Sequence, residues 1–346
     1  MSKRRSAGEE SSEPEPAMVL ADADLPAFFI ASDQASLTGQ RKRTKTLATM
    51  LIFTVLAAVS GAFTVKIAGR HFATPGVISG LAFLAALGCS IYLLQARPEQ
   101  NWYVGRAAAE STRTLAWLYA VGGGLFNLQT CTDPEARLLD LIANIANQLG
   151  HTNPTGQLSY LADRTTHHIT DKMKAIRGAS LAVRKSTYLT GRIDQQLDWY
   201  KRKARLNAKA EVIWLRVTLG LQLVGLVVAL ASAFGEVKFD LLGLIAAAAA
   251  ATAAWLEAKD HGTLAAAYHI TAFDLSLARD RAMMIEPDDT ETTWADFVES
   301  AEFAISREHT LWLARGGIRW QGPFTSGNHV HNGQVQARWW RWRSAR

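Results

Sequence analysis

The sequence predicts an all-α, multi-pass membrane protein with two transmembrane helical hairpins, whose long helices extend into a cytoplasmic helical bundle. Three observations predict this fold. Four uncharged apolar runs fall into two pairs, each joined by a short polar segment. Basic residues cluster outside the pairs rather than between them. No alternating pattern typical of a strand extends beyond a few residues.

The apolar runs have the length and composition of membrane spans. The first hairpin, 46–96, contains the runs Thr46–Val65 and Gly76–Ala96, and the second hairpin, 217–256, contains Val217–Gly235 and Leu241–Leu256. A helix needs about 20 apolar residues to cross a bilayer, and local thinning or oligomerisation accommodates shorter spans. The fourth run is short and rich in alanine, so a buried helix of a soluble bundle is an alternative for it. Trp255 at its end favours the membrane.

The charge distribution predicts the orientation. The net charge is +6, yet the hairpin loops contain only Lys66, Arg70 and Lys238 as basic residues. The basic residues that flank the spans on the other side are Arg41, Lys42, Arg43, Lys45, Arg97, Arg106, Lys201, Arg202, Lys203, Arg205, Lys209 and Arg216. By the positive-inside rule, both termini and the middle region are cytoplasmic, in the cell inner membrane. Their position beside apolar spans makes the lipid bilayer the expected partner, and nucleic acid an unlikely one.

The chain divides into four parts. Residues 1–20 are expected to be a disordered tail, because they offer almost nothing to bury. Residues 21–190 and 191–315 form two units of the same design, each with one hairpin, as expected of a repeat. Residues 316–346 form a tail in which Arg338, Arg341, Arg343 and Arg346 interleave with three tryptophans. This mixture suits a membrane interface or single-stranded nucleic acid, or has no specific partner.

Start and stop signals define several cytoplasmic helices. Gly122–Gly124 is expected to end the helix that follows the first hairpin. Asp133 precedes a proline and is a good N-cap for the next helix, which Gly150 is expected to end. Gly191 is a possible interruption before the helix that leads into the third span.

The residues give little indication of catalysis. There is no phosphate-binding loop, no paired-cysteine zinc spacing and no nucleophile elbow, and the two cysteines argue against a disulfide scaffold. Glu302, Glu308 and His309 are compatible with acid–base chemistry, but their spacing also suits a helix locked to its neighbours by ion pairs, which we favour. We therefore expect no enzyme activity, no catalytic residue, no metal and no cofactor.

Polar groups inside a membrane are costly, so they indicate function or helix packing. Thr218, Gln222 and Gly225 form a polar or small stripe in the third span and are the candidates for lining a pore. An interhelical hydrogen bond within one subunit is an equal alternative for Gln222. The fourth span has a small-residue face suited to close helix packing, formed by Gly243, Ala247, Ala250, Ala251 and Ala254.

Four motifs carry a resemblance to a known family. They are LPAFFIASDQASLTGQ, NWYVGRAAAESTRTLAW, RKSTYLTGRIDQQLDWYKRKA and WADFVESAEFAISREHTLW, and together they surround both hairpins. The chain resembles tandem members of the SLATT family, the two-transmembrane effector domains associated with bacterial nucleotide-signalling conflict systems. The matching motif residues, expected to be structural, are Trp102, Arg106, Glu110, Trp117, Trp199, Tyr200, Glu302, Glu308, His309 and Trp312.

The resemblance implies an oligomeric membrane pore or channel, gated through its cytoplasmic helices, that acts as an effector in anti-phage defence. It also implies activation by a nucleotide second messenger or a partner protein, although no nucleotide-synthase or nucleotide-sensing module is recognisable in this chain. A homo-oligomer is expected, because four spans cannot easily enclose a water path alone. The alternative is a membrane-anchored scaffold that recruits a partner without conducting ions. A transporter would favour interrupted helices and mid-membrane charges, and an enzyme is less expected still.

Overall fold

The computed structural model describes residues 17–62, 66–67, 70–71, 74–152, 167–234, 241–285 and 290–315. In this part of the chain the predicted all-α fold is confirmed. The exception is a minimal antiparallel pair in the first hairpin loop, in which β1 (Lys66–Ile67) pairs with β2 (Arg70–His71).

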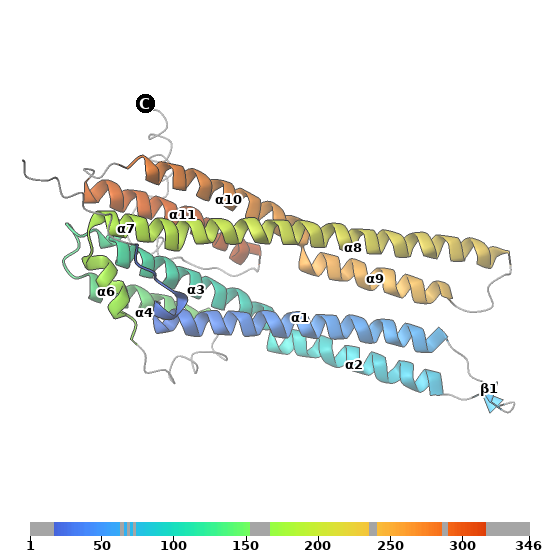
Figure 1. Ribbon diagram of the computed structural model, residues 1–346. Helices are drawn as coiled ribbons and strands as arrows, with labels where there is room; N and C mark the ends of the chain where they lie inside the picture. Colours follow the sequence, from blue (N-terminus) through green and yellow to red (C-terminus); the bar gives the residue numbers. More distant parts are fainter. Residues whose placement is uncertain are drawn as a thin grey trace, which may run out of the picture.

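The two hairpins lie side by side at one end of an elongated molecule (Figure 1). The first hairpin is α1 (Ala27–Ala62) followed by α2 (Thr74–Ala96), and the second is α8 (Gln195–Ala233) followed by α9 (Leu241–Lys259). Helix α9 packs against both α8 and α1, so the four helices follow the order α2, α1, α9, α8. Helices α1 and α8 begin inside the bundle and continue into the hairpins without a break.

Each hairpin helix is suited to a bilayer. All four belong to helical stretches long and apolar enough to cross a membrane, and only a small share of each apolar window is buried inside the chain. Large apolar side chains such as Leu84, Leu94, Leu219 and Leu223 are more than half exposed. Lipid or neighbouring subunits must therefore cover these surfaces.

The bundle at the other end contains the remaining helices. In chain order, its helical elements after α2 are α3 (Pro98–Val121), η2 (Gly124–Phe126), α4 (Pro134–Thr152), α6 (Asp171–Gly178), α7 (Leu181–Tyr188), the π-helical turn η3 (Leu189–Asp194), α10 (His261–Met283) and α11 (Glu291–Arg315). A short 3-10 turn, η1 (Asp22–Asp24), precedes α1. Helix α3 lies at the centre, because it packs against α1, α4, α6, α7 and α11, and its residues 114–121 are all buried.

Local signals explain where several elements begin and end. The Asp133 carboxylate accepts a hydrogen bond from the Ala136 amide at 3.0 Å, as its N-cap position predicts. Gly122 ends α3 in the left-handed region, with a φ of 75°, where the absence of a Cβ removes the steric cost. The glycine break predicted there is confirmed.

Three expectations about boundaries need correction. Helix α4 continues through Gly150 to Thr152, so that glycine does not end it. Gly191 interrupts the α-helical pattern only locally, since it lies in the π-helical turn through which α7 passes into α8 without a break in the helix. Residues 17–20, expected to belong to the disordered tail, are ordered, because Leu20 is buried and the Met18 amide donates to the Thr187 hydroxyl at 2.9 Å. Residues 1–16 lie outside the described part.

Each of the two units has a sharp bend at the equivalent position, between the second hairpin helix and the helix that follows it. Arg97, between α2 and α3, has a φ of 39°, and Asp260, between α9 and α10, has a φ of 47°. A left-handed residue that is not glycine is uncommon, and here it bends the chain at the point where each hairpin meets the bundle. Each unit thus has one helix that continues through this level and one that turns there.

Glycines allow α1 to approach α3 closely near the first bend. A Cβ at Gly39 would lie 2.8 Å from both the Pro98 carbonyl oxygen and the Trp102 amide nitrogen. A Cβ at Gly105 would lie 2.9 Å from the Ser36 amide nitrogen. Because these neighbours are backbone atoms, neither position has room for a side chain. The contact fixes the direction in which the first hairpin leaves the bundle.

Candidate functional site

The predicted polar stripe of α8 contains two buried residues and one exposed residue. Thr218 is 9% exposed and its hydroxyl lies 3.2 Å from that of Thr252 on α9. Gly225, one heptad further, is also buried, and a Cβ there would lie 3.3 Å from a methyl group of Ile245. Both residues therefore pack inside the hairpin. Gln222 is exposed on the outer surface.

The amide of Gln222 is chemically isolated. Within the described residues it has no hydrogen-bond partner, and its neighbours Leu219, Leu223 and Leu226 are large exposed apolar side chains. An unpaired amide facing hydrocarbon costs free energy, so it is best satisfied by water or by another subunit. Of the three candidate pore-lining residues, Gln222 is the one whose side chain is exposed on the surface of the chain.

The small residues of α9 also divide between two environments. Gly243, Ala250 and Ala254 are exposed, whereas Ala247 and Ala251 are partly buried. No residue of α9 is fully buried in the chain. The exposed part of this face is available for packing between subunits, where small residues permit close approach of helices.

The motif that follows the first hairpin lies where the two units meet. Arg106 forms an ion pair with Glu110 at 3.1 Å, and its guanidinium lies 6.0 Å from the ring centre of Trp199. Trp199 and Tyr200 both pack against Tyr268, with ring centres 5.5 and 5.7 Å away. These motif residues therefore join α3 of the first unit to α8 and α10 of the second.

A buried ion pair lies deeper in the bundle. Glu302 on α11 is 0% exposed, and each of its carboxylate oxygens accepts one hydrogen bond from Arg192 at 2.8 Å. Glu302 also accepts a hydrogen bond from the hydroxyl of Tyr188 at 3.0 Å and one from Thr114 at 2.7 Å. This Glu302 cluster, formed by Glu302, Arg192, Tyr188 and Thr114, therefore joins α3, α7, η3 and α11.

The Glu302 cluster stabilises the packing of the helices that it joins. Bidentate pairing with an arginine gives the carboxylate the geometry that offsets its burial. Burial and, after it, the negative charge of Glu302 raise the pKa of Tyr188 well above its usual value of 10.0, so the phenol stays protonated and donates. Trp117 packs edge-on against Tyr188, with ring centres 5.8 Å apart. The arrangement gives Glu302 a structural part in the bundle.

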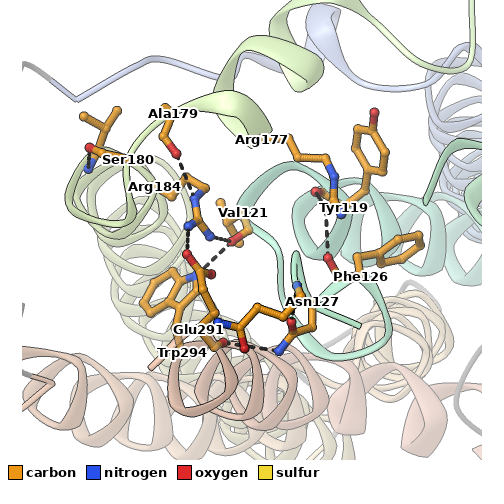
Figure 2. Close-up of polar contacts among 12 residues, drawn as sticks. Tyr119, Val121, Phe126, Asn127, Arg177, Ala179, Ser180, Arg184, Glu291 and Trp294 are labelled. Atoms are coloured by element: carbon orange, nitrogen blue, oxygen red, sulfur yellow. Dashed lines mark hydrogen bonds and ion pairs between the residues drawn. The ribbon is translucent and has the colours of Figure 1, made fainter. Parts of the chain in front are cut away.

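Two further arginines hold the far end of α3, as Figure 2 shows. Arg177 donates to the carbonyl oxygens of Tyr119 and Phe126, both at 2.8 Å. Arg184 donates to the Val121 carbonyl at 2.9 Å and pairs with Glu291 of α11. Cations at a helix C-terminus satisfy its free carbonyls and its dipole. These contacts attach α6, α7 and α11 to the end of α3.

Sequence reasoning found some of these residues and missed others. It singled out Glu302 but not Arg192, Arg177 or Arg184, because nothing in the sequence indicates which cations face inward. The available signal, an arginine within a helix that also contains buried apolar residues, is only a weak indication that the arginine is buried. Glu308, His309 and Trp312 belong to α11, but their side chains lie outside the described part of the chain.

Comparison with known families agrees with this arrangement. Residues 26–185 match the model of "SMODS and SLOG-associating 2TM effector domain 3". Residues 188–312 match that of "SMODS and SLOG-associating 2TM effector domain 1". No curated protein and no solved structure matches the chain. With two such domains in succession, each containing one apolar hairpin and part of a shared bundle, the chain is a membrane protein that belongs to the SLATT family as a tandem member.

Proposed function

We propose that the protein is an effector that assembles in the cell inner membrane as a homo-oligomer and forms an ion-conducting pore, gated through its cytoplasmic bundle. SLATT domains are effector domains of conflict systems, which supports the effector role. The pore, its gating and an anti-phage role are our proposals. The role is non-enzymatic, and both termini are cytoplasmic, as the basic flanks indicate.

One observation carries the pore proposal. Gln222 lies on the exposed surface of a membrane helix, surrounded by leucines. In a single chain this amide would face lipid, at a cost that a ring of subunits removes by turning it toward a central water path. The exposed small residues Gly243, Ala250 and Ala254 of the neighbouring helix provide a surface for close packing between subunits.

Activation would act through the bundle. The chain is expected to respond to a nucleotide second messenger or to a partner protein, in line with the signalling systems with which SLATT effector domains are associated. The Glu302 cluster connects α11 to the start of α8, the helix on which Gln222 lies. A ligand that changes the position of α11 would therefore act on the pore helix.

The experiment that tests the proposal measures ion flux through liposomes that contain the purified protein, with and without candidate nucleotides. We expect Gln222→Leu to reduce flux while insertion and oligomer size stay unchanged. Gln222→Glu should favour cations, because a ring of carboxylates attracts them. Ser232→Ala, which changes an exposed hydroxyl bonded to its own helix, is the matched control and should conduct normally. Normal and equally selective flux in both Gln222 variants would exclude this residue from the pore.

A second function is favoured by a different surface. Ile270 and Phe273 on α10 are 60% and 62% exposed, although they lie in the bundle and not in a hairpin. Exposed apolar residues three positions apart on a helix are typical of a protein-binding face. If the wild-type protein shows no flux with any nucleotide or partner, the scaffold that recruits a partner through this face becomes the better explanation.

A further inference from the structure

Aromatic residues mark the level at which the second hairpin leaves the membrane. Trp214 on α8 and Trp255 on α9 pack together, with ring centres 6.0 Å apart. Tryptophan is enriched at the boundary between hydrocarbon and headgroups. On α1 the apolar run begins at Thr46, so Arg43 and Thr44 lie just outside it. Lys259, four residues after Trp255, lies at the corresponding level on α9.

The two hairpins meet at this level through basic residues. The Lys259 ammonium donates to the Thr44 hydroxyl at 3.2 Å, and the Arg43 guanidinium donates to the Ala258 carbonyl at 3.4 Å. Each of these contacts joins α1 of the first unit to α9 of the second. We call the group formed by Arg43, Thr44, Trp255 and Lys259 the α1–α9 junction.

The α1–α9 junction has an excess of positive charge. Arg43 has an ion pair with Glu99 at 3.2 Å and lies 5.9 Å from the ring centre of Trp102. Among the described residues Lys259 has no carboxylate at ion-pair distance, and its ammonium lies 4.8 Å from the ring centre of Trp255 instead.

The junction also contains a hydrogen-bond donor without an acceptor. The indole nitrogen of Trp255 is buried and has no partner within the described residues. Lys259 uses one of its three N–H groups on Thr44. A partly buried ammonium with N–H groups still to be satisfied is best stabilised by an anion with several acceptor oxygens. Phosphate has this chemistry, and at this level of the bilayer phosphate is the headgroup of a lipid.

We propose that the α1–α9 junction binds the phosphate headgroup of an anionic phospholipid in the cytoplasmic leaflet. Basic pockets between transmembrane helices on the cytoplasmic side are a known type of lipid site. Because the junction is formed by both units, the bound lipid would hold the two hairpins together. The proposal does not depend on ion conduction, and it holds equally for a scaffold.

The test uses the purified full-length protein in detergent and counts bound lipids by native mass spectrometry. The added ligands are phosphatidylglycerol, phosphatidylcholine and inorganic phosphate. We expect the wild-type protein to retain phosphatidylglycerol, and Lys259→Gln to weaken its binding by about fivefold, the share of one basic residue near a membrane surface. Lys259→Arg, which keeps the charge, should retain it. Lys42→Gln is the matched control, since Lys42 is exposed at the same level of α1, and it should bind normally.

A thermal-shift measurement separates lipid binding from folding. Added phosphatidylglycerol should raise the unfolding temperature of the wild-type protein, because a ligand that binds the folded state stabilises it. It should not raise that of Lys259→Gln or of Lys259→Met, each compared with itself without lipid. Unchanged lipid binding in Lys259→Gln and Lys259→Met would overturn the proposal. So would an equal loss in Lys42→Gln, which indicates diffuse attraction, or displacement of the lipid by inorganic phosphate, which indicates a site for free phosphate.

Discussion

Glu302 holds three elements of the bundle together, because its carboxylate accepts hydrogen bonds from Thr114 of α3, Tyr188 of α7 and Arg192 of η3. We expect Glu302→Ala to reduce the free energy of unfolding by about 3 to 5 kcal/mol, the usual cost of leaving one partner of a buried ion pair alone. The unpaired residue would be Arg192, which is 1% exposed. Thermal unfolding in detergent measures the effect.

The double variant Arg192→Met with Glu302→Met is the control for this interpretation. Removal of both charges leaves no buried ion without a partner, so part of the lost stability should return. The recovery should be incomplete, because the Tyr188 hydroxyl would lose its acceptor. If the double variant is less stable than Glu302→Ala, the destabilisation does not come from an unpaired charge.

A further prediction concerns the close approach of α1 to α3 at Gly39. Gly39→Ala places a methyl group 2.8 Å from backbone atoms of Pro98 and Trp102, which cannot move aside as a side chain can. We expect a loss of about 1 to 3 kcal/mol, typical of an overpacked contact. Gly178→Ala is the matched control, because nothing lies within 4 Å of a Cβ there. Equal stability of the two variants would show that α1 and α3 can separate without cost.

Residue-scale chemistry was only partly predictable from the sequence. The N-cap Asp133 and the helix-ending Gly122 are local signals, and the structure has both. The partners of Glu302 are distant in sequence, since Arg192 is 110 positions away, and periodicity carries no information about such a pair. The left-handed Arg97 and Asp260 were also unpredictable, because glycine, the residue that normally signals that conformation, is absent there.

At the scale of elements, the exposed face of α9 carries a prediction about assembly. Ala250 and Ala254 lie on the outside of the chain, so leucine at both positions has no contact to disturb inside it. We expect the Ala250→Leu, Ala254→Leu variant to keep its monomer fold and to lose detergent-stable oligomers, because larger side chains keep helices apart. Size-exclusion chromatography with light scattering measures the oligomer.

Ala233→Leu, the same substitution at the exposed end of α8, is the control and should assemble normally. Unchanged assembly of the α9 variant would mean that this face contacts lipid. The sequence identified this small-residue face but not its division, because a helical wheel shows which residues share a face and not which neighbour covers it. Ala247 and Ala251, which are partly buried, belong to the side nearer the other hairpin helices.

For the whole molecule, membrane orientation is the property most open to direct measurement. In a background without Cys89 and Cys131, cysteines at Ala68 and Val237 in the hairpin loops should react with impermeant reagents in intact cells. A cysteine at Thr190 should not, because the bundle is expected to be cytoplasmic. Thr190 is exposed, so its protection would report the membrane and not burial.

Permeabilised cells provide the control, since the cysteine at Thr190 should then be labelled. Labelling of Thr190 in intact cells would overturn the orientation. The arrangement of the four spans was predictable in outline, because uncharged runs and basic flanks are properties of composition. The adjacency of α1 and α9 was not, since it depends on how two hairpins of similar surface meet.

The unbroken helices α1 and α8 have a mechanical consequence. Helix α8 has 39 residues and is therefore about 58 Å long, with one end beside the Glu302 cluster and the other near the far end of the apolar run. A rotation of about 5° at the bundle would displace the outer end by about 5 Å, on the same helix geometry. Helices α2 and α9 join the bundle through the bends at Arg97 and Asp260 and cannot transmit such a rotation rigidly. Each hairpin therefore combines one continuous helix with one helix that is attached through a bend. Small rotations among the cytoplasmic helices would thus produce larger displacements on the opposite side of the membrane.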